Sequence, residues 1–139
     1  MSLENAVYPD RDQIESLMKS EADGPVSMLN LLKFKEKAAY EDGRETELSG
    51  FEAYQLYARE MRKIVEREGG KFVFLGGADQ LVVGSGEMGW QSVGIVEYPS
   101  RQEFIRITSL PEVQEIGVHR AAGLEGQLLI AMSDLTNLA

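Results

Sequence analysis

Residues 71–98, KFVFLGGADQLVVGSGEMGWQSVGIVEY, determine the fold class of this chain. Residues 71–90 indicate a long strand that ends in a glycine-rich turn at 84–89, and residues 90–98 indicate a second strand, a pattern typical of a hairpin. The pair Gly76-Gly77 predicts a bulge or bend within the first strand. The chain therefore contains two antiparallel strands in direct succession, and the segments on either side determine the architecture.

Helical patterns flank this hairpin on both sides. Residues 50–70 repeat apolar side chains at a spacing of about 3.6 and end in two glycines, as an amphipathic helix does. Residues 99–117 predict two short helices in succession, the second with Pro111 in its first turn. Each of the three helices starts at a capping-box pair. These pairs are Ser49 with Glu52, Ser100 with Glu103, and Ser109 with Glu112.

The first and the last strand of the pattern lie at residues 25–34 and 126–133. The order is then βαββαβ, which predicts an α+β, ferredoxin-like fold with a four-stranded antiparallel sheet and right-handed crossovers. A short amphipathic helix at residues 10–20 precedes this unit. We expect residues 1–21 to form an N-terminal appendage and residues 22–139 to form the domain.

The first strand is apolar on both of its faces. One face carries Val26, Met28, Asn30, Leu32 and Phe34, and the other carries Ser27, Leu29, Leu31 and Lys33. Helices cover one face of a ferredoxin-like sheet, so the second apolar face needs another cover. A second copy of the same sheet is the simplest cover, and we therefore predict a homodimer formed face to face through the sheets.

Several stretches resemble a known family. They are MLNLLKFKEKAAY, AYQLYAREM and, most specifically, VEYPSRQEF followed by HRAAGLE, within a likeness that spans residues 25–133. They resemble the DUF1330 family of the dimeric α/β-barrel superfamily. The resemblance implies a ferredoxin-like protomer, a dimeric barrel and a ligand held between sheet and helices. It implies no particular reaction, because proteins of this superfamily range from oxygenases and isomerases to sensing domains.

Composition excludes several classes of function. The chain has 139 residues, a formal net charge of −9 and no cysteine. Such a charge opposes binding to nucleic acids and to anionic membranes. Neither a signal peptide nor an apolar span is visible, and we expect a cytoplasmic protein. One histidine and scattered acids form no metal-ligand pattern, and the glycine runs match no nucleotide fingerprint, so we expect neither a metal nor a cofactor.

Two of the charged and titratable candidates for a site, His119 and Arg120, lie just before the final strand. His119 is the only histidine, and an imidazole suits general acid or base catalysis. The neighbouring Arg120, and with less support Arg106, could hold a substrate carboxylate in a bidentate pair. Each also has a structural interpretation, as a histidine bonded to backbone carbonyls or an arginine in a surface ion pair.

Asn30, Trp90 and Tyr54 are the remaining candidates. Asn30 is a polar amide among apolar neighbours, where it could orient a substrate oxygen or satisfy a structural hydrogen bond. Trp90 and Tyr54, together with Tyr57, could line an aromatic pocket or belong to the core.

Three functions fit these residues. The first is a cofactor-independent oxygenase, isomerase or lyase acting on a small aromatic or carboxylate compound, with His119 and Asn30 catalytic. The second is a non-catalytic, small-molecule-binding or stress-related dimer. The third is a protein-interaction module that uses its acidic surface and the long polar segment 35–49, which is either a functional lid or a solvated loop.

Overall fold

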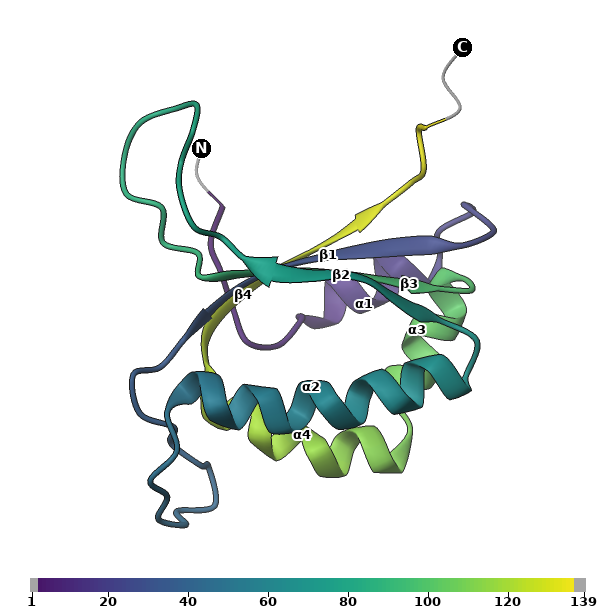
Figure 1. Cartoon of the computed structure of the whole chain (residues 1–139). Helices are drawn as coiled ribbons and strands as arrows, with labels where there is room; N and C mark the ends of the chain where they lie inside the picture. Colours follow the sequence, from purple (N-terminus) through teal and green to yellow (C-terminus); the bar gives the residue numbers. More distant parts are fainter. Residues whose placement is uncertain (1–2, 137–139) are drawn as a thin grey trace.

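A computed structural model describes residues 3–136 (Figure 1). The elements are α1 (Arg11–Met18), β1 (Val26–Phe34), α2 (Gly50–Arg67), β2 (Lys71–Gly77), β3 (Ser92–Tyr98), α3 (Arg101–Thr108), α4 (Pro111–Gly123) and β4 (Leu124–Met132). The four strands form one antiparallel sheet in the order β2-β3-β1-β4. This arrangement confirms the predicted α+β, ferredoxin-like fold.

Helix α2 begins and ends where the capping residues in its sequence predict. The backbone N–H of Glu52 donates to the Ser49 hydroxyl over 3.0 Å, and the N–H of Ser49 donates to the Glu52 carboxylate over 2.9 Å. This reciprocal pair satisfies two donors that the first turn of a helix leaves free. Two residues after α2, Gly69 has a φ of +96°, a conformation that glycine adopts without strain and that ends the helix.

The region between β2 and β3 differs from the prediction. β2 ends at Gly77, residues 78–91 form a loop, and Trp90 precedes β3 instead of beginning it. The irregularity in β2 lies between Phe72 and Phe74, not at the paired glycines. The ladder between the two strands ends at the pair of Gly77 with Ser92. Beyond it, the Ala78 N–H still donates to the Gln91 carbonyl over 3.0 Å, and then the two segments separate into the loop.

The start of α4 is a second correction. Ser109 was predicted to cap this helix, but Leu110 occupies the N-cap without a side-chain hydrogen bond, and Pro111 is the first helical residue. Ser109 instead ends α3, where its N–H donates to the carbonyls of Ile105 and Arg106. The two helices follow each other so closely that one serine cannot complete the first and cap the second.

The two faces of the sheet have different surroundings. Val26, Met28 and Leu32 of β1 are buried beneath α2 and α4, which lie together on one side of the sheet in Figure 1. The opposite face, here called the outer face, is also apolar, as the sequence predicted. Strand pairing places Leu29, Leu31, Val93, Ile95, Leu128 and Ile130 on it. No helix of residues 3–136 covers this outer face. Among the helices of these residues, none has the length and apolar character that a membrane span requires.

The N-terminal segment packs against the rest of the chain at two places. Ala6 forms an isolated antiparallel bridge with Gln127 of β4, with N–O distances of 3.1 and 2.8 Å. Further along, α1 lies beside α3, and Leu17 packs against the main hydrophobic core. The segment thereby pairs with the open edge of β4 at Gln127. The proposed boundary between residues 1–21 and 22–139 remains a prediction.

Candidate functional site

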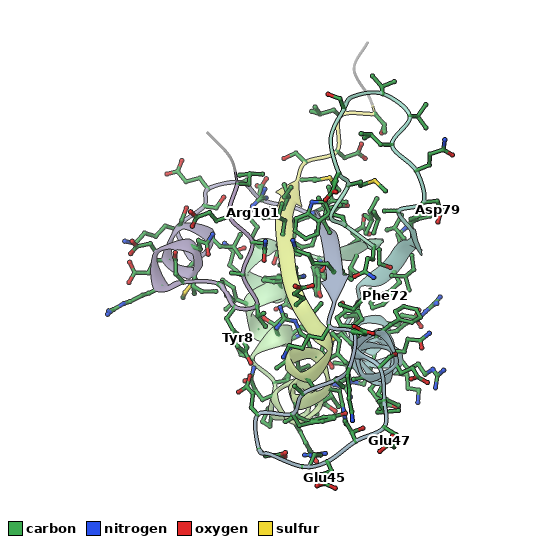
Figure 2. The ribbon with its side chains drawn as sticks, turned by 90° about the vertical axis from the view of Figure 1, so that its left-hand side faces the viewer. Tyr8, Glu45, Glu47, Phe72, Asp79 and Arg101 are labelled. Carbon is green, nitrogen blue, oxygen red and sulfur yellow. The ribbon has the colours of Figure 1, made fainter. Side chains whose placement is uncertain are left out.

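A cavity of about 770 Å³ lies between the inner face of the sheet and the helices. The four strands form one wall, α2 and α4 form the opposite wall, and the N-terminal segment with α1 closes one side. The volume is within the usual range for pockets that bind small molecules. Figure 2 shows the labelled Tyr8 in the N-terminal segment beside β4 and the labelled Phe72 on the other side, near α2. Both residues line the cavity.

A chain of three polar side chains crosses the sheet wall of this cavity. Arg120 donates from Nη2 to the Gln127 Oε1, and the Gln127 Nε2 donates to the Asn30 Oδ1 over 2.7 Å. Asn30 in turn donates from Nδ2 to the carbonyls of Met28 and Gly94, over 3.3 and 3.4 Å. Because each amide has both its donor and its acceptor engaged, neither is free to rotate. The network therefore holds Arg120 in a defined position.

Three tyrosines, here called the cavity tyrosines, bring phenol groups to the same space. They are Tyr54 and Tyr57 of α2 and Tyr98 of β3. Burial raises the pKa of all three phenols, so each hydroxyl stays protonated near neutral pH. Among residues 3–136 no fully buried side-chain oxygen or nitrogen lacks a partner, and no hydrogen bond joins these hydroxyls to another described residue. The hydroxyls therefore face the cavity as available donors.

Arg120 carries the positive charge that acts on two of these phenols. Its charge lowers the pKa of Tyr54 and Tyr57 and so opposes part of the effect of burial. Its guanidinium also lies 5.6 Å from the centre of the Tyr8 ring, and its Nη2 donates to the Val7 carbonyl over 2.5 Å. Arg120 thus links the cavity wall to the N-terminal segment.

His119 lies next to Arg120 in sequence but is not among the residues that line the cavity. Its Nδ1 is 2.7 Å from the hydroxyl of Tyr40, and the two rings meet edge to face with centres 5.5 Å apart. Tyr40 is a buried residue of the 35–49 loop. The imidazole therefore attaches this loop to α4, and the predicted catalytic role of His119 remains an untested prediction.

Arg106 and Trp90 also lie away from the cavity. Arg106 is exposed and forms ion pairs with Glu68 over 2.8 Å and with Glu103 over 2.7 Å. The Trp90 ring lies 5.0 Å beneath the Nζ of Lys33, whose side chain belongs to the outer face of β1. Of the predicted site residues, the structure brings together only Asn30, Arg120 and Tyr54.

The family model for a domain of unknown function, DUF1330, matches residues 44–133. This match covers more than half of the chain. The chain belongs to the DUF1330 family. No curated protein matches it significantly.

Solved structures extend the comparison of this DUF1330 protein. A crystal structure of the methylated RPA0582 protein is 34% identical, covers 96% of this chain and 98% of its own, and superposes with a TM-score of 0.86. A second structure of RPA0582, described as a protein of unknown function from Rhodopseudomonas palustris, is 32% identical, with coverages of 93% and 96% and a TM-score of 0.82. A DABB family protein with a ferredoxin-like fold from Mesorhizobium loti is 13% identical, with coverages of 81% and 99% and a TM-score of 0.50, and it supports the fold alone.

Sequence reasoning missed Gln127 in this DUF1330 protein, although it connects the other two polar residues. The available signal was the one that singled out Asn30, a polar amide inside a strongly apolar strand. Tyr98 was also missed, because it ends the apolar run of β3 and nothing in the sequence distinguishes it from the other residues of that strand. Its burial at 5% exposure places it in the core beside the cavity.

Proposed function

We propose that this DUF1330 protein binds a small, largely apolar compound in the cavity between the sheet and helices α2 and α4. The observation that carries the proposal is the cavity itself, which combines apolar walls with the polar chain of Arg120, Gln127 and Asn30 and with the cavity tyrosines. Binding sites for small molecules usually have this composition, because apolar area supplies affinity and a few polar groups fix orientation.

The apolar walls favour a flat or aromatic ligand. Met28, Met61 and Val96 belong to the main hydrophobic core, and Phe72 packs against it. All four also line the cavity. Methionine and aromatic side chains give favourable contacts to aromatic rings. The cavity tyrosines add ring surface and hydroxyl donors at the same place.

Binding is better supported than turnover. Phenols whose pKa is raised by burial donate hydrogen bonds but do not accept protons near neutral pH. Asn30 has its amide groups engaged, and His119 lies outside the cavity lining. Cofactor-independent oxygenase, isomerase or lyase activity, with Asn30 orienting an oxygen, is the second candidate. The cytoplasmic location also remains a prediction.

A screen with two readouts tests the proposal. The protein is heated with pools of small aromatic compounds and monitored for a shift in the unfolding midpoint, while product formation is followed by mass spectrometry. A ligand at 100 times its Kd should stabilise the folded state by about 2.7 kcal/mol. Stabilisation without product supports binding alone, and product supports the enzymatic candidate.

A pair of variants shows whether the cavity is the site. Ala58→Phe places a ring in the cavity and should abolish the ligand-induced shift. Leu56→Phe adds a ring to the exposed side of the same helix and should leave the shift intact. The proposal is wrong if no compound stabilises the parent protein, or if Ala58→Phe responds as the parent does.

We also propose that the outer face forms a homodimer interface with a second copy of this chain. Val73 and Phe74 of β2 are 50% and 56% exposed, and Ile130 of β4 is 40% exposed. A contiguous apolar face of this kind on a strand surface marks an interface more often than free surface. Two such faces are self-complementary, as a twofold dimer requires.

Sedimentation velocity at micromolar concentration measures the dimer directly. The expected species has twice the chain mass of 15.4 kDa. Phe74→Glu places a charge on the outer face and should give monomers, whereas Phe51→Glu, at a comparably exposed position on α2, should not. A monomeric parent protein would exclude this interface.

A further inference from the structure

We infer that the ligand of the cavity carries a carboxylate and that the Arg120 guanidinium binds it. This inference rests on the proposed small-molecule function and specifies the chemical class of the compound. The body of the ligand lies among the apolar walls, and the cavity tyrosines donate hydrogen bonds beside the carboxylate.

Arg120 differs from the arginines of the protein surface. The chain has 23 acidic and 14 basic residues, so carboxylates are plentiful. Arg11, Arg44, Arg62, Arg67 and Arg106 each form an ion pair. Arg59 and Arg101 form none within residues 3–136, but neither of them lines the cavity. No ion pair among residues 3–136 includes Arg120, although it is half-buried and lines the cavity. A partly buried charge without a counter-charge is costly, and an anionic ligand would supply the missing partner.

The donors of Arg120 are only partly engaged. Both of its hydrogen bonds within residues 3–136 come from Nη2, and both acceptors are neutral oxygens, of Val7 and Gln127. Nε and Nη1 donate to no other described residue. A guanidinium has five N–H donors, and the two on Nη2 are engaged here, which fixes the group. The three N–H donors of Nε and Nη1 remain available, and a ligand carboxylate would accept single, charge-assisted hydrogen bonds from them.

Acidic groups at the cavity margin do not neutralise this charge. Asp42 of the 35–49 loop is paired with Arg44 over 2.6 Å. Glu41 of the same loop accepts a hydrogen bond from the Tyr8 hydroxyl over 3.0 Å. Glu4, in the N-terminal segment, is exposed. Each of these carboxylates therefore has its own partner or contact with water, and Arg120 remains the positive group that faces the cavity.

A matched pair of probes tests the inference by isothermal titration calorimetry. The probes are 2-naphthoate, which carries a carboxylate, and 2-naphthylmethanol, which has the same ring and no charge. The parent protein should bind 2-naphthoate more tightly. Arg120→Gln should weaken binding of 2-naphthoate about 10- to 100-fold, because hydrogen bonds to a charged group are lost, and should change binding of 2-naphthylmethanol little.

Arg106→Gln is the control, because it removes the same charge from the surface and should leave both affinities unchanged. Arg120→Lys keeps the charge but loses the planar group that Val7 and Gln127 hold in position, and we expect an intermediate loss for 2-naphthoate alone. Circular dichroism checks that each variant is folded, and Arg120→Lys decides the outcome if Arg120→Gln is not.

The outcomes separate the two proposals. If neither probe binds the parent protein, the proposed function fails and the inference fails with it. If both probes bind and the Arg120 variants weaken them equally, the cavity binds ligands but the carboxylate assignment is wrong. Selective loss of 2-naphthoate supports both.

Discussion

The contact between α2 and α4 gives a prediction whose sign can be worked out from the structure. Gly50 begins α2 and Gly123 ends α4, and the Lys35 backbone joins them. Lys35 N–H donates to the Gly123 carbonyl over 2.8 Å, and Gly50 N–H donates to the Lys35 carbonyl over 3.0 Å. A Cβ added at Gly123 would lie 2.2 Å from the Gly50 carbonyl oxygen and 2.9 Å from the Tyr54 nitrogen. Both atoms belong to the backbone, so Gly123→Ala forces the helices apart.

The same helix offers a matched control. A Cβ added at Gly117 would meet nothing within 4 Å. Replacing glycine with alanine inside a helix stabilises it by about 0.5–1 kcal/mol. Overpacking a close contact costs about 1–3 kcal/mol, and the gain in helix propensity at Gly123 is small because this residue ends α4. We therefore expect Gly117→Ala to stabilise the fold and Gly123→Ala to destabilise it by about 1–3 kcal/mol.

Urea unfolding followed by far-ultraviolet circular dichroism measures both changes, at one protein concentration so that any dimer contributes equally. At about 3 °C per kcal/mol, the thermal midpoint should rise by about 2–3 °C for Gly117→Ala and fall by about 3–9 °C for Gly123→Ala. Changes of the same sign, or a Gly123→Ala variant as stable as the parent, would refute the argument that these helices require glycine at their contact.

Three further predictions concern groups around the site and the surface. Hydrogen bonds from Arg106 hold the pKa of Glu68 and Glu103 below the usual value, so these pairs stabilise the fold above about pH 4.3 and lose this effect as the pH falls. In the Arg106→Gln variant, the unfolding midpoint should therefore fall less steeply between about pH 6 and pH 3 than in the parent protein. An unchanged slope would contradict this prediction. Because burial raises the pKa of the cavity tyrosines, absorbance at about 295 nm at about pH 10.5 should show far less phenolate than in denaturant, and equal signals would be evidence against burial. Tyr40→Phe removes the hydrogen bond to His119 and should lower the free energy of unfolding, measured in urea, by about 0.5–1.5 kcal/mol. The 35–49 loop of this variant should also be cleaved faster by protease. If stability and cleavage are both unchanged, this bond does not hold the loop.

The placement of this loop illustrates how far local pattern reaches. Figure 2 shows the labelled Glu45 and Glu47 at the end of the molecule opposite the labelled Asp79 of the β2–β3 loop. Sequence predicted the polar segment 35–49 to be a loop, but between β2 and β3 it predicted only the glycine-rich turn at 84–89 and not the loop as a whole. It could not predict that Tyr40 would be buried against α4, since that contact joins residues 79 positions apart.

The sequence by itself determined the order of helices and strands, because helix periodicity, the Ser49–Glu52 capping box and the two apolar faces of β1 depend on near neighbours. Where two local patterns competed, as at Ser109, only the folded chain decided between them. The strand boundaries near Gly77 depended in the same way on whether a partner strand was present.

Only the tertiary structure decided which polar residues share the cavity. Asn30 and Gln127 are 97 positions apart and meet because their strands pair. His119 and Arg120 are adjacent, yet they point in different directions, because consecutive residues of an α-helix are rotated by about 100°. One side chain therefore reaches Tyr40 and the other reaches the cavity. The sequence identified both residues as candidates, and the geometry of the helix separated their roles.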